Sequence, residues 1–145
     1  FVYNFMIQFI YNTSFRLSNE KTVSEWITFI AKAEGITLKK VFYNYVSPKE
    51  IRTLNKKHLS HDYATDVLTF DYSSKKDISG DVFICQEQVE INAKNYSQSV
   101  ENETIRVVCH AILHLCGYSD ATEDQILVMR SKEDHYLKVF QTTFK

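Results

Sequence analysis

Two histidines four residues apart, His110 and His114, have the clearest capacity for chemistry in this chain. On an α-helix, side chains four residues apart lie on the same face one turn apart, so both imidazoles can bind one metal ion. Gly117 follows at a spacing where glycine ends helices, which would bring Asp120 over the pair. Two nitrogens and one oxygen leave the fourth position of a tetrahedral zinc ion open for water, as in catalytic sites. The sequence therefore predicts one Zn²⁺ per chain, bound by His110, His114 and Asp120.

The ligand spacing also matches the metzincin peptidases, which place a glycine and a third ligand at the same offsets. A peptidase of that type uses a glutamate directly after the first histidine as its general base, and here that position is Ala111. Because alanine cannot accept a proton, a metzincin-like metallopeptidase is a less favoured alternative.

Residues 110–120 resemble the signature of the YbeY family of metal-dependent endoribonucleases, which act in rRNA maturation. The positions that match this signature are His110, Leu113, His114, Leu115, Gly117 and Tyr118. Ala111 replaces a glycine of the family, and Asp120 stands in place of its third histidine ligand. A carboxylate keeps the coordination number but lowers the net charge at the metal by one unit.

Two upstream segments carry the same resemblance. Residues 65–70, TDVLTF, are similar to a threonine-aspartate strand of the family, and residues 80–84, GDVFI, to its following glycine-aspartate strand. The family's arginine six residues before that threonine is replaced by Leu59. Lys57 and His61 are nearby cationic candidates for contact with the substrate, although neither matches a family residue.

The resemblance implies a single-strand-specific endoribonuclease of the cytoplasm that acts in 16S rRNA 3′-end processing and in ribosome quality control. Its partners would be rRNA and the ribosomal subunit, and a zinc-activated water would hydrolyse the phosphodiester bond. The general base and the oligomeric state remain unassigned. A non-catalytic, zinc-containing ribosome-assembly factor is an alternative, and Leu59 fits it.

Composition favours one folded domain over residues 1–145 without a membrane span. The chain is 44% hydrophobic and has three cysteines, an odd number that does not suggest a disulfide framework. No apolar run approaches the ~20 residues of a membrane helix. The net charge of −1 lacks the basic footprint of nucleic-acid binders, and the cations of residues 52–61 form either a local patch or a solvated helix face. Met6 is a candidate natural start, which would make residues 1–5 non-native or disordered.

The order of the expected elements predicts an α+β fold, a single compact domain with a mixed four-stranded sheet, helices packed on it and a zincin-like metal helix. We expect a capping box of Thr22 and Glu25 on the first helix and one of Ser47 and Glu50 on the second. Strands are predicted at residues 6–13, 36–46, 66–72 and 81–86, and the later helices at residues 87–97, 104–115 and 122–141.

Smaller features give further expectations. All three glycines are predicted to mark element boundaries. Asp66 or Asp81 could accept a hydrogen bond from the second nitrogen of a ligand histidine, although turn or cap roles are equally compatible. Tyr118 either stabilises developing charge or packs. His135 is expected to be an ordinary polar-face residue.

Overall fold

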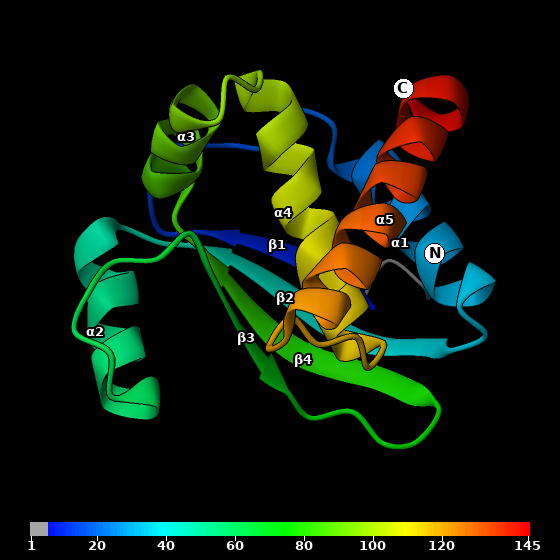
Figure 1. The fold of residues 1–145 in the computed structure, drawn as a ribbon, viewed down its shortest axis with the longest axis horizontal. Coiled ribbons are helices and arrows are strands. Elements are labelled where there is room, and N and C mark those ends of the chain that lie inside the picture. The colour runs from blue at the N-terminus through cyan, green and yellow to red at the C-terminus, as the bar shows by residue number, and fades with distance from the viewer. Residues whose placement is uncertain (1–5) are drawn as a thin grey trace.

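A mixed four-stranded sheet carries helices against both of its faces (Figure 1). The structure is a computed structural model that describes residues 6–145, so the segment 1–5, predicted to be non-native or disordered, lies outside the described residues. The described elements are β1 (Ile7–Tyr11), α1 (Glu20–Ala33), β2 (Thr37–Tyr45), α2 (Pro48–Leu59), β3 (Val67–Asp71), β4 (Asp77–Ile84), α3 (Gln86–Asn95), α4 (Val100–Leu115), α5 (Glu123–Val139) and a π-helical turn (Phe140–Phe144). The predicted α+β class and mixed four-stranded sheet are confirmed.

The strands are ordered β1-β2-β4-β3. β1, β2 and β4 are parallel, and β3 pairs antiparallel with β4. Parallel neighbours need a crossover connection, which α1 supplies between β1 and β2. β3 is an edge strand of this sheet. It packs close to α4, the helix that carries two of the predicted metal ligands.

The main core lies between the sheet and helices α1 and α4. Buried side chains such as Val41 and Val82 of the sheet meet Trp26 of α1 and Ile112 of α4. α3 and α5 pack against α4, which makes α4 the central helix of this layer (Figure 1). A smaller cluster joins α2 to the opposite face of the sheet at β3, and consists of Val46, Ile51, Leu68 and Cys85. Within residues 6–145, no helix has the length and apolar character needed to cross a bilayer.

The two predicted capping boxes have different outcomes. The box of Ser47 and Glu50 is present at the start of α2. The box of Thr22 and Glu25 is wrong, because α1 already begins at Glu20. The Tyr11 hydroxyl of β1 donates a hydrogen bond of 2.6 Å to Glu20. This contact stabilises the first turn of α1, which begins two residues before the predicted cap.

Gly80 also departs from its prediction, since it lies inside β4 and not at an element boundary. A Cβ atom there would lie 2.7 Å from the Phe70 carbonyl oxygen and 2.8 Å from Cδ2 of Leu115. Glycine is thus required by the close approach of α4 to the sheet. Gly35 and Gly117 have φ of +74° and +107° and follow the ends of α1 and α4, as predicted.

Candidate metal centre

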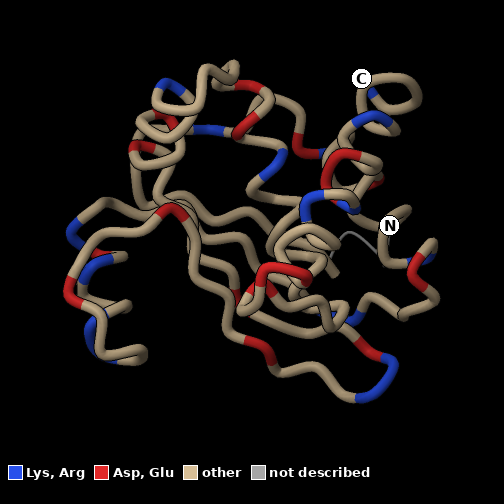
Figure 2. The backbone as a smooth tube through the Cα atoms, viewed as in Figure 1, with Lys and Arg blue, Asp and Glu red and all other residues tan. Residues whose placement is uncertain are grey.

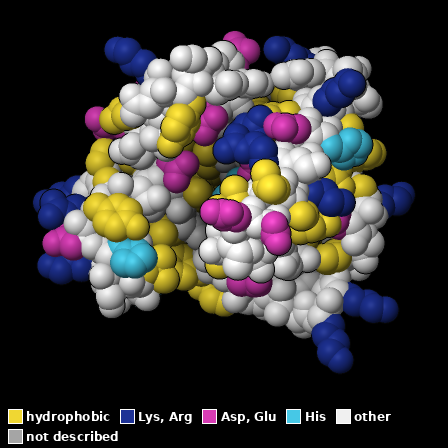
Figure 3. All heavy atoms as spheres, viewed as in Figure 1, with side chains coloured by type: hydrophobic (Ala, Val, Ile, Leu, Met, Phe, Trp, Pro, Cys, Tyr) yellow, Lys and Arg dark blue, Asp and Glu magenta, His cyan; other side chains and the backbone are white. Residues whose placement is uncertain are grey.

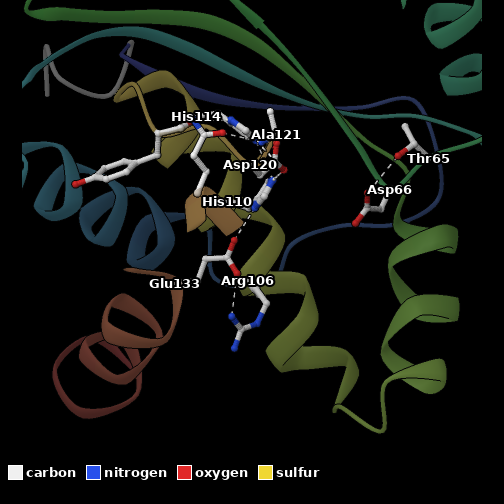
Figure 4. Close-up of polar contacts among 10 residues, drawn as sticks. Thr65, Asp66, Arg106, His110, His114, Asp120, Ala121 and Glu133 are labelled. Carbon is white, nitrogen blue, oxygen red and sulfur yellow. Dashed lines mark hydrogen bonds and ion pairs between the residues drawn. The ribbon is translucent and has the colours of Figure 1, made fainter. Parts of the chain in front are cut away.

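The loop after α4 brings the three predicted ligands together. The Gly117 N–H donates to the His114 carbonyl at 3.0 Å and the Tyr118 N–H to that of Leu113 at 3.1 Å. This pair of hydrogen bonds is the Schellman motif, which reverses the chain after a helix. Asp120 then faces the imidazoles of His110 and His114, and the three side chains point toward one another (Figure 4).

The separations of the ligand atoms fit a tetrahedral zinc ion. The two Nε2 atoms of His110 and His114 are 3.0 Å apart, and Oδ2 of Asp120 lies 3.4 and 3.5 Å from them. Ligands about 2.0–2.1 Å from a tetrahedral ion are separated from each other by about 3.3 Å. One ion can therefore contact all three atoms without a large rearrangement.

Hydrogen bonds on the far side of each imidazole assign the proton positions. Nδ1 of His114 lies 2.9 Å from the Tyr118 carbonyl oxygen, which can only accept, so this nitrogen carries the hydrogen. Nδ1 of His110 lies 2.5 Å from the Glu133 carboxylate and is the donor there as well. Both Nε2 lone pairs then face the same space beside Asp120, where a cation or a proton would relieve the repulsion between them.

Glu133, on α5, is the residue of this site that the sequence analysis missed. It is 3% exposed and accepts a second hydrogen bond of 2.9 Å from Arg106, which also contacts Asp134 at 2.8 Å. Burial would raise the pKa of Glu133, but His110 and Arg106 outweigh it and hold this pKa below its ordinary value. Burial by itself would lower the pKa of the His110 imidazole. The Glu133 carboxylate outweighs burial, so the pKa of the metal-free imidazole is raised.

Of the two roles considered for Asp66 and Asp81, the orientation of a ligand histidine is excluded, since Glu133 and the Tyr118 carbonyl take both positions. Asp66 lies apart from the cluster and accepts a hydrogen bond of 3.3 Å from the Thr65 hydroxyl (Figure 4). One sequence signal could have identified Glu133. It stands at a core-facing position of its helix together with Met129, Tyr136 and Leu137, and a lone carboxylate on an apolar face rarely lacks a buried partner.

A second network holds the loop from the side of α1. The Tyr118 hydroxyl donates to Glu34 at 2.7 Å, and the Tyr136 hydroxyl and Lys132 donate to the same carboxylate. Burial alone would raise the pKa of Glu34, but these three donors hold it below its ordinary value. The hydroxyl of Tyr118 therefore packs against α1 and α5, while its carbonyl orients His114.

A cavity of about 400 Å³ opens beside His110 and Asp120, between α3, α4 and α5. Figure 3 shows this face hollowed at its centre, with acidic, basic and apolar side chains around the hollow. Asp66, Asn92 and Arg130 are among the residues that line it. Two larger hollows lie elsewhere on the surface and contain none of the three ligands.

The predicted substrate contacts, Lys57 and His61, lie at the end of α2 and in the following loop. Both are exposed, and the His61 ring stacks on Tyr63 with 5.5 Å between ring centres. Neither lines the cavity beside the metal ligands. Acidic and basic residues are interspersed along the chain, including α2, and do not form one basic stripe (Figure 2). A role for Lys57 and His61 in binding substrate stays a prediction.

A family model and similar curated proteins indicate the same family. The family model described as endoribonuclease YbeY matches residues 9–141. The chain is 38% identical over 135 residues to endoribonuclease YbeY of Flavobacterium johnsoniae, covering 93% of this chain and 97% of that protein. It is 37% identical over 132 residues to endoribonuclease YbeY of Karelsulcia muelleri, covering 91% and 94% of the two chains. The solution structure of TM1509 from Thermotoga maritima is similar with a TM-score of 0.67 and 30% identity, over 93% of this chain and 89% of that one.

Proposed function

The chain belongs to the endoribonuclease YbeY family, and from this we propose that it is a metal-dependent endoribonuclease that acts in rRNA processing. His110, His114 and Asp120 bind one zinc ion per chain. The substrate is single-stranded RNA at the 3′ end of 16S rRNA, on the ribosomal subunit in the cytoplasm. The same cleavage serves in ribosome quality control, and residues 1–145 act as one domain.

The observation that carries this proposal is the convergence of three ligand atoms within 4.8 Å of one another, with the hydrogens of both imidazoles on the outer nitrogens. Three protein ligands leave one position open. When bound, a divalent ion there lowers the pKa of a water molecule and polarises a phosphoryl oxygen. The donor set thus suits hydrolysis better than a closed structural site.

The surrounding residues have separate tasks in this reaction. Glu133 and the Tyr118 carbonyl keep a hydrogen on Nδ1 of each imidazole, which leaves Nε2 free as a ligand. Arg106 compensates the charge of Glu133 by ion pairing at 2.9 Å. The adjoining cavity provides room for a segment of an RNA strand next to the ligands.

Hydrolysis of peptides is less well supported by the same geometry. Ala111 is fully buried and occupies the position of the metzincin glutamate. Glu133 does not replace that base, because His110 and Arg106 already engage its carboxylate. A non-catalytic assembly factor is favoured by one observation only, the half-exposed Leu59 in place of the family's arginine.

Cleavage of a labelled 16S rRNA 3′-end fragment tests the proposal, with wild type compared with His114→Ala after zinc loading. We expect about one zinc per wild-type chain and metal-dependent cleavage, with both lost in the variant because two ligands hold zinc far less tightly than three. His135→Ala is the matched control, since His135 is exposed on α5 outside the cluster. One bound zinc without cleavage of any RNA would instead support the assembly factor, and cleavage of a peptide library would support the peptidase.

A further inference from the structure

Glu103 is a buried carboxylate that the proposed hydrolysis does not use. It is 8% exposed and lines the cavity beside the metal ligands. Its side chain forms no hydrogen bond or ion pair with any residue in the range 6–145 that the structure describes. Burial raises the pKa of Glu103, an effect that the nearby charges of Arg106 and Arg130 only partly offset. The Glu103 oxygens are not among the side-chain atoms that are sealed from solvent without a partner, so they face the cavity, where a donor of a ligand can reach them.

Two further residues of the same cavity have the properties of a nucleotide site. Tyr96, at the end of α3, is 68% exposed although it lines the cavity, so its ring is available for stacking. Arg130 of α5 lines it too and is exposed, and it forms no ion pair with the described part of the chain. Arg106, by contrast, is occupied by Glu133 and Asp134. The volume of about 400 Å³ lies in the ~300–1,000 Å³ range of ligand cavities.

The position of Glu103 relative to the metal ligands suits a neighbouring nucleotide. Glu103 and His110 are seven residues apart on the same face of α4, which corresponds to roughly 10 Å along the helix axis. A base bound at Glu103 would therefore belong to a nucleotide close to the bond that is cleaved, and not to a distant part of the RNA.

The chemistry of a carboxylate selects among the bases. Its two oxygens only accept hydrogen bonds. Guanine alone presents two adjacent donors on its Watson–Crick edge, N1–H and the 2-amino group, whereas adenine presents one donor beside an acceptor. Unpaired bases in single-stranded RNA are recognised by such edge contacts together with stacking on aromatic rings.

We propose that this cavity binds a guanine base of the RNA, with Glu103 accepting from its N1–H and amino group, Tyr96 stacking on its ring and Arg130 near its phosphate. The inference rests on the proposed function, since it assigns a base preference to the same site. It makes the protein a nuclease that favours strands with a guanine next to the cleaved bond.

Titration calorimetry of the zinc-loaded protein with 5′-GMP, 5′-IMP and 5′-AMP tests this directly. The three nucleotides carry the same phosphate, so any contact of that phosphate with the metal cancels in the comparison. We expect wild type to bind GMP on the order of tenfold more tightly than AMP, with IMP, which lacks the 2-amino group, in between. Glu103→Gln should lose most of this preference while its affinity for AMP changes little.

Matched variants separate base recognition from general damage. Glu101→Gln makes the same change on the same helix at a side chain that is 86% exposed, and should keep the preference. Tyr96→Ala should weaken all three nucleotides several-fold while Tyr96→Phe does not, because stacking needs only the ring. Zinc content and circular dichroism of Glu103→Gln verify that the variant is folded. Equal affinity of wild type for GMP and AMP, or an unchanged preference in folded Glu103→Gln, would overturn the inference.

The binding measurement does not depend on turnover, so the two proposals can fail separately. A Glu103-dependent preference for GMP without cleavage of any RNA would contradict the proposed hydrolysis and support the guanine site. Cleavage of RNA without any such preference would support the proposed hydrolysis and contradict the guanine site.

Discussion

The metal ligands and the end of α2 are two regions to which the sequence assigned functional residues, and they are built in opposite ways. At the metal centre, each imidazole has a fixed acceptor behind it, a buried carboxylate or a backbone carbonyl. Residues 57–63, which we call the α2 segment, are exposed, and His61 contacts Tyr63 of the same segment. Metal binding needs ligand atoms that are held in place before the ion arrives, whereas the exposed side chains of the α2 segment have much more freedom.

The ion pairs of the two regions differ in the same way, because the pair at the metal centre is buried and the pair near the end of α2 is exposed. Arg106 and Glu133 form a largely buried ion pair, in which loss of one partner leaves the other charged and poorly solvated. Arg52 of α2 and Asp62 of the α2 segment form a pair at 2.8 Å that is open to water and salt and contributes little to stability. Substitutions at the metal centre should therefore have larger effects than substitutions in the α2 segment.

Glu133→Gln should have the largest effect in this comparison. The amide still fits the site but is a weaker acceptor for His110 and carries no charge for Arg106, so we expect zinc affinity to fall about 10–100-fold. Competition with a chromophoric chelator measures this. Asp134→Asn is the matched control, because Asp134 contacts the same Arg106 but is exposed and does not touch His110. Equal zinc affinity in Glu133→Gln and wild type would show that the buried carboxylate does not position the imidazole.

Glu34→Gln should have an intermediate effect, mainly on stability and with a defined dependence on pH. Burial raises the pKa of Glu34 and its three donors outweigh this, so the folded pKa lies below the unfolded value of about 4.3. Its contribution is then fully present above that value and is lost as pH falls through the folded pKa. At pH 7 the variant should be less stable by about 1–2 kcal/mol, and at pH 3 the difference should shrink.

Urea unfolding of metal-free wild type and Glu34→Gln at both pH values measures this difference. Glu25→Gln serves as control, since Glu25 is an exposed glutamate on the same helix. A stability difference that is the same at pH 7 and pH 3 would contradict the assigned ionisation of Glu34.

The contrast also explains how much of the site the sequence could predict. His110, His114 and Asp120 lie within eleven residues, where helix geometry and one glycine determine how the side chains meet. Glu133 contacts His110 from α5, and Glu34, directly after α1, contacts Tyr118 of the ligand loop. Their contacts depend on how these helices pack against α4, which no local spacing encodes.

The fold follows the same division. The order of strands and helices, and the start of α2 at its capping box, come from local patterns. The start of α1 was misplaced because Tyr11, on a different element, binds Glu20. β4 begins at Asp77, four residues earlier than predicted, because Asp77 and Ile78 pair with Thr37 and Leu38 of β2. The start of α4 was also placed four residues too late, at residue 104 instead of Val100, although its cap is local, with the Ser99 side chain accepting a hydrogen bond from the Asn102 N–H. Tertiary contacts thus account for the errors at α1 and β4, whereas the start of α4 has a signal in the sequence itself.

Lys57→Ala and His61→Ala should have the smallest effects, and they test the α2 segment instead of the metal centre. If the α2 segment contacts the RNA backbone, each change should weaken RNA binding a few-fold whatever the sequence, and loss of Lys57 should lower the salt slope of binding by about one. Zinc content should not change, since neither residue lines the metal cavity. Fluorescence anisotropy of a labelled single strand over a range of salt concentrations measures this, with Lys21→Ala on α1 as an exposed control. An unchanged salt slope would exclude Lys57 from the RNA contact. Loss of zinc would mean that the α2 segment and the metal centre are coupled, which would contradict the contrast between the two regions.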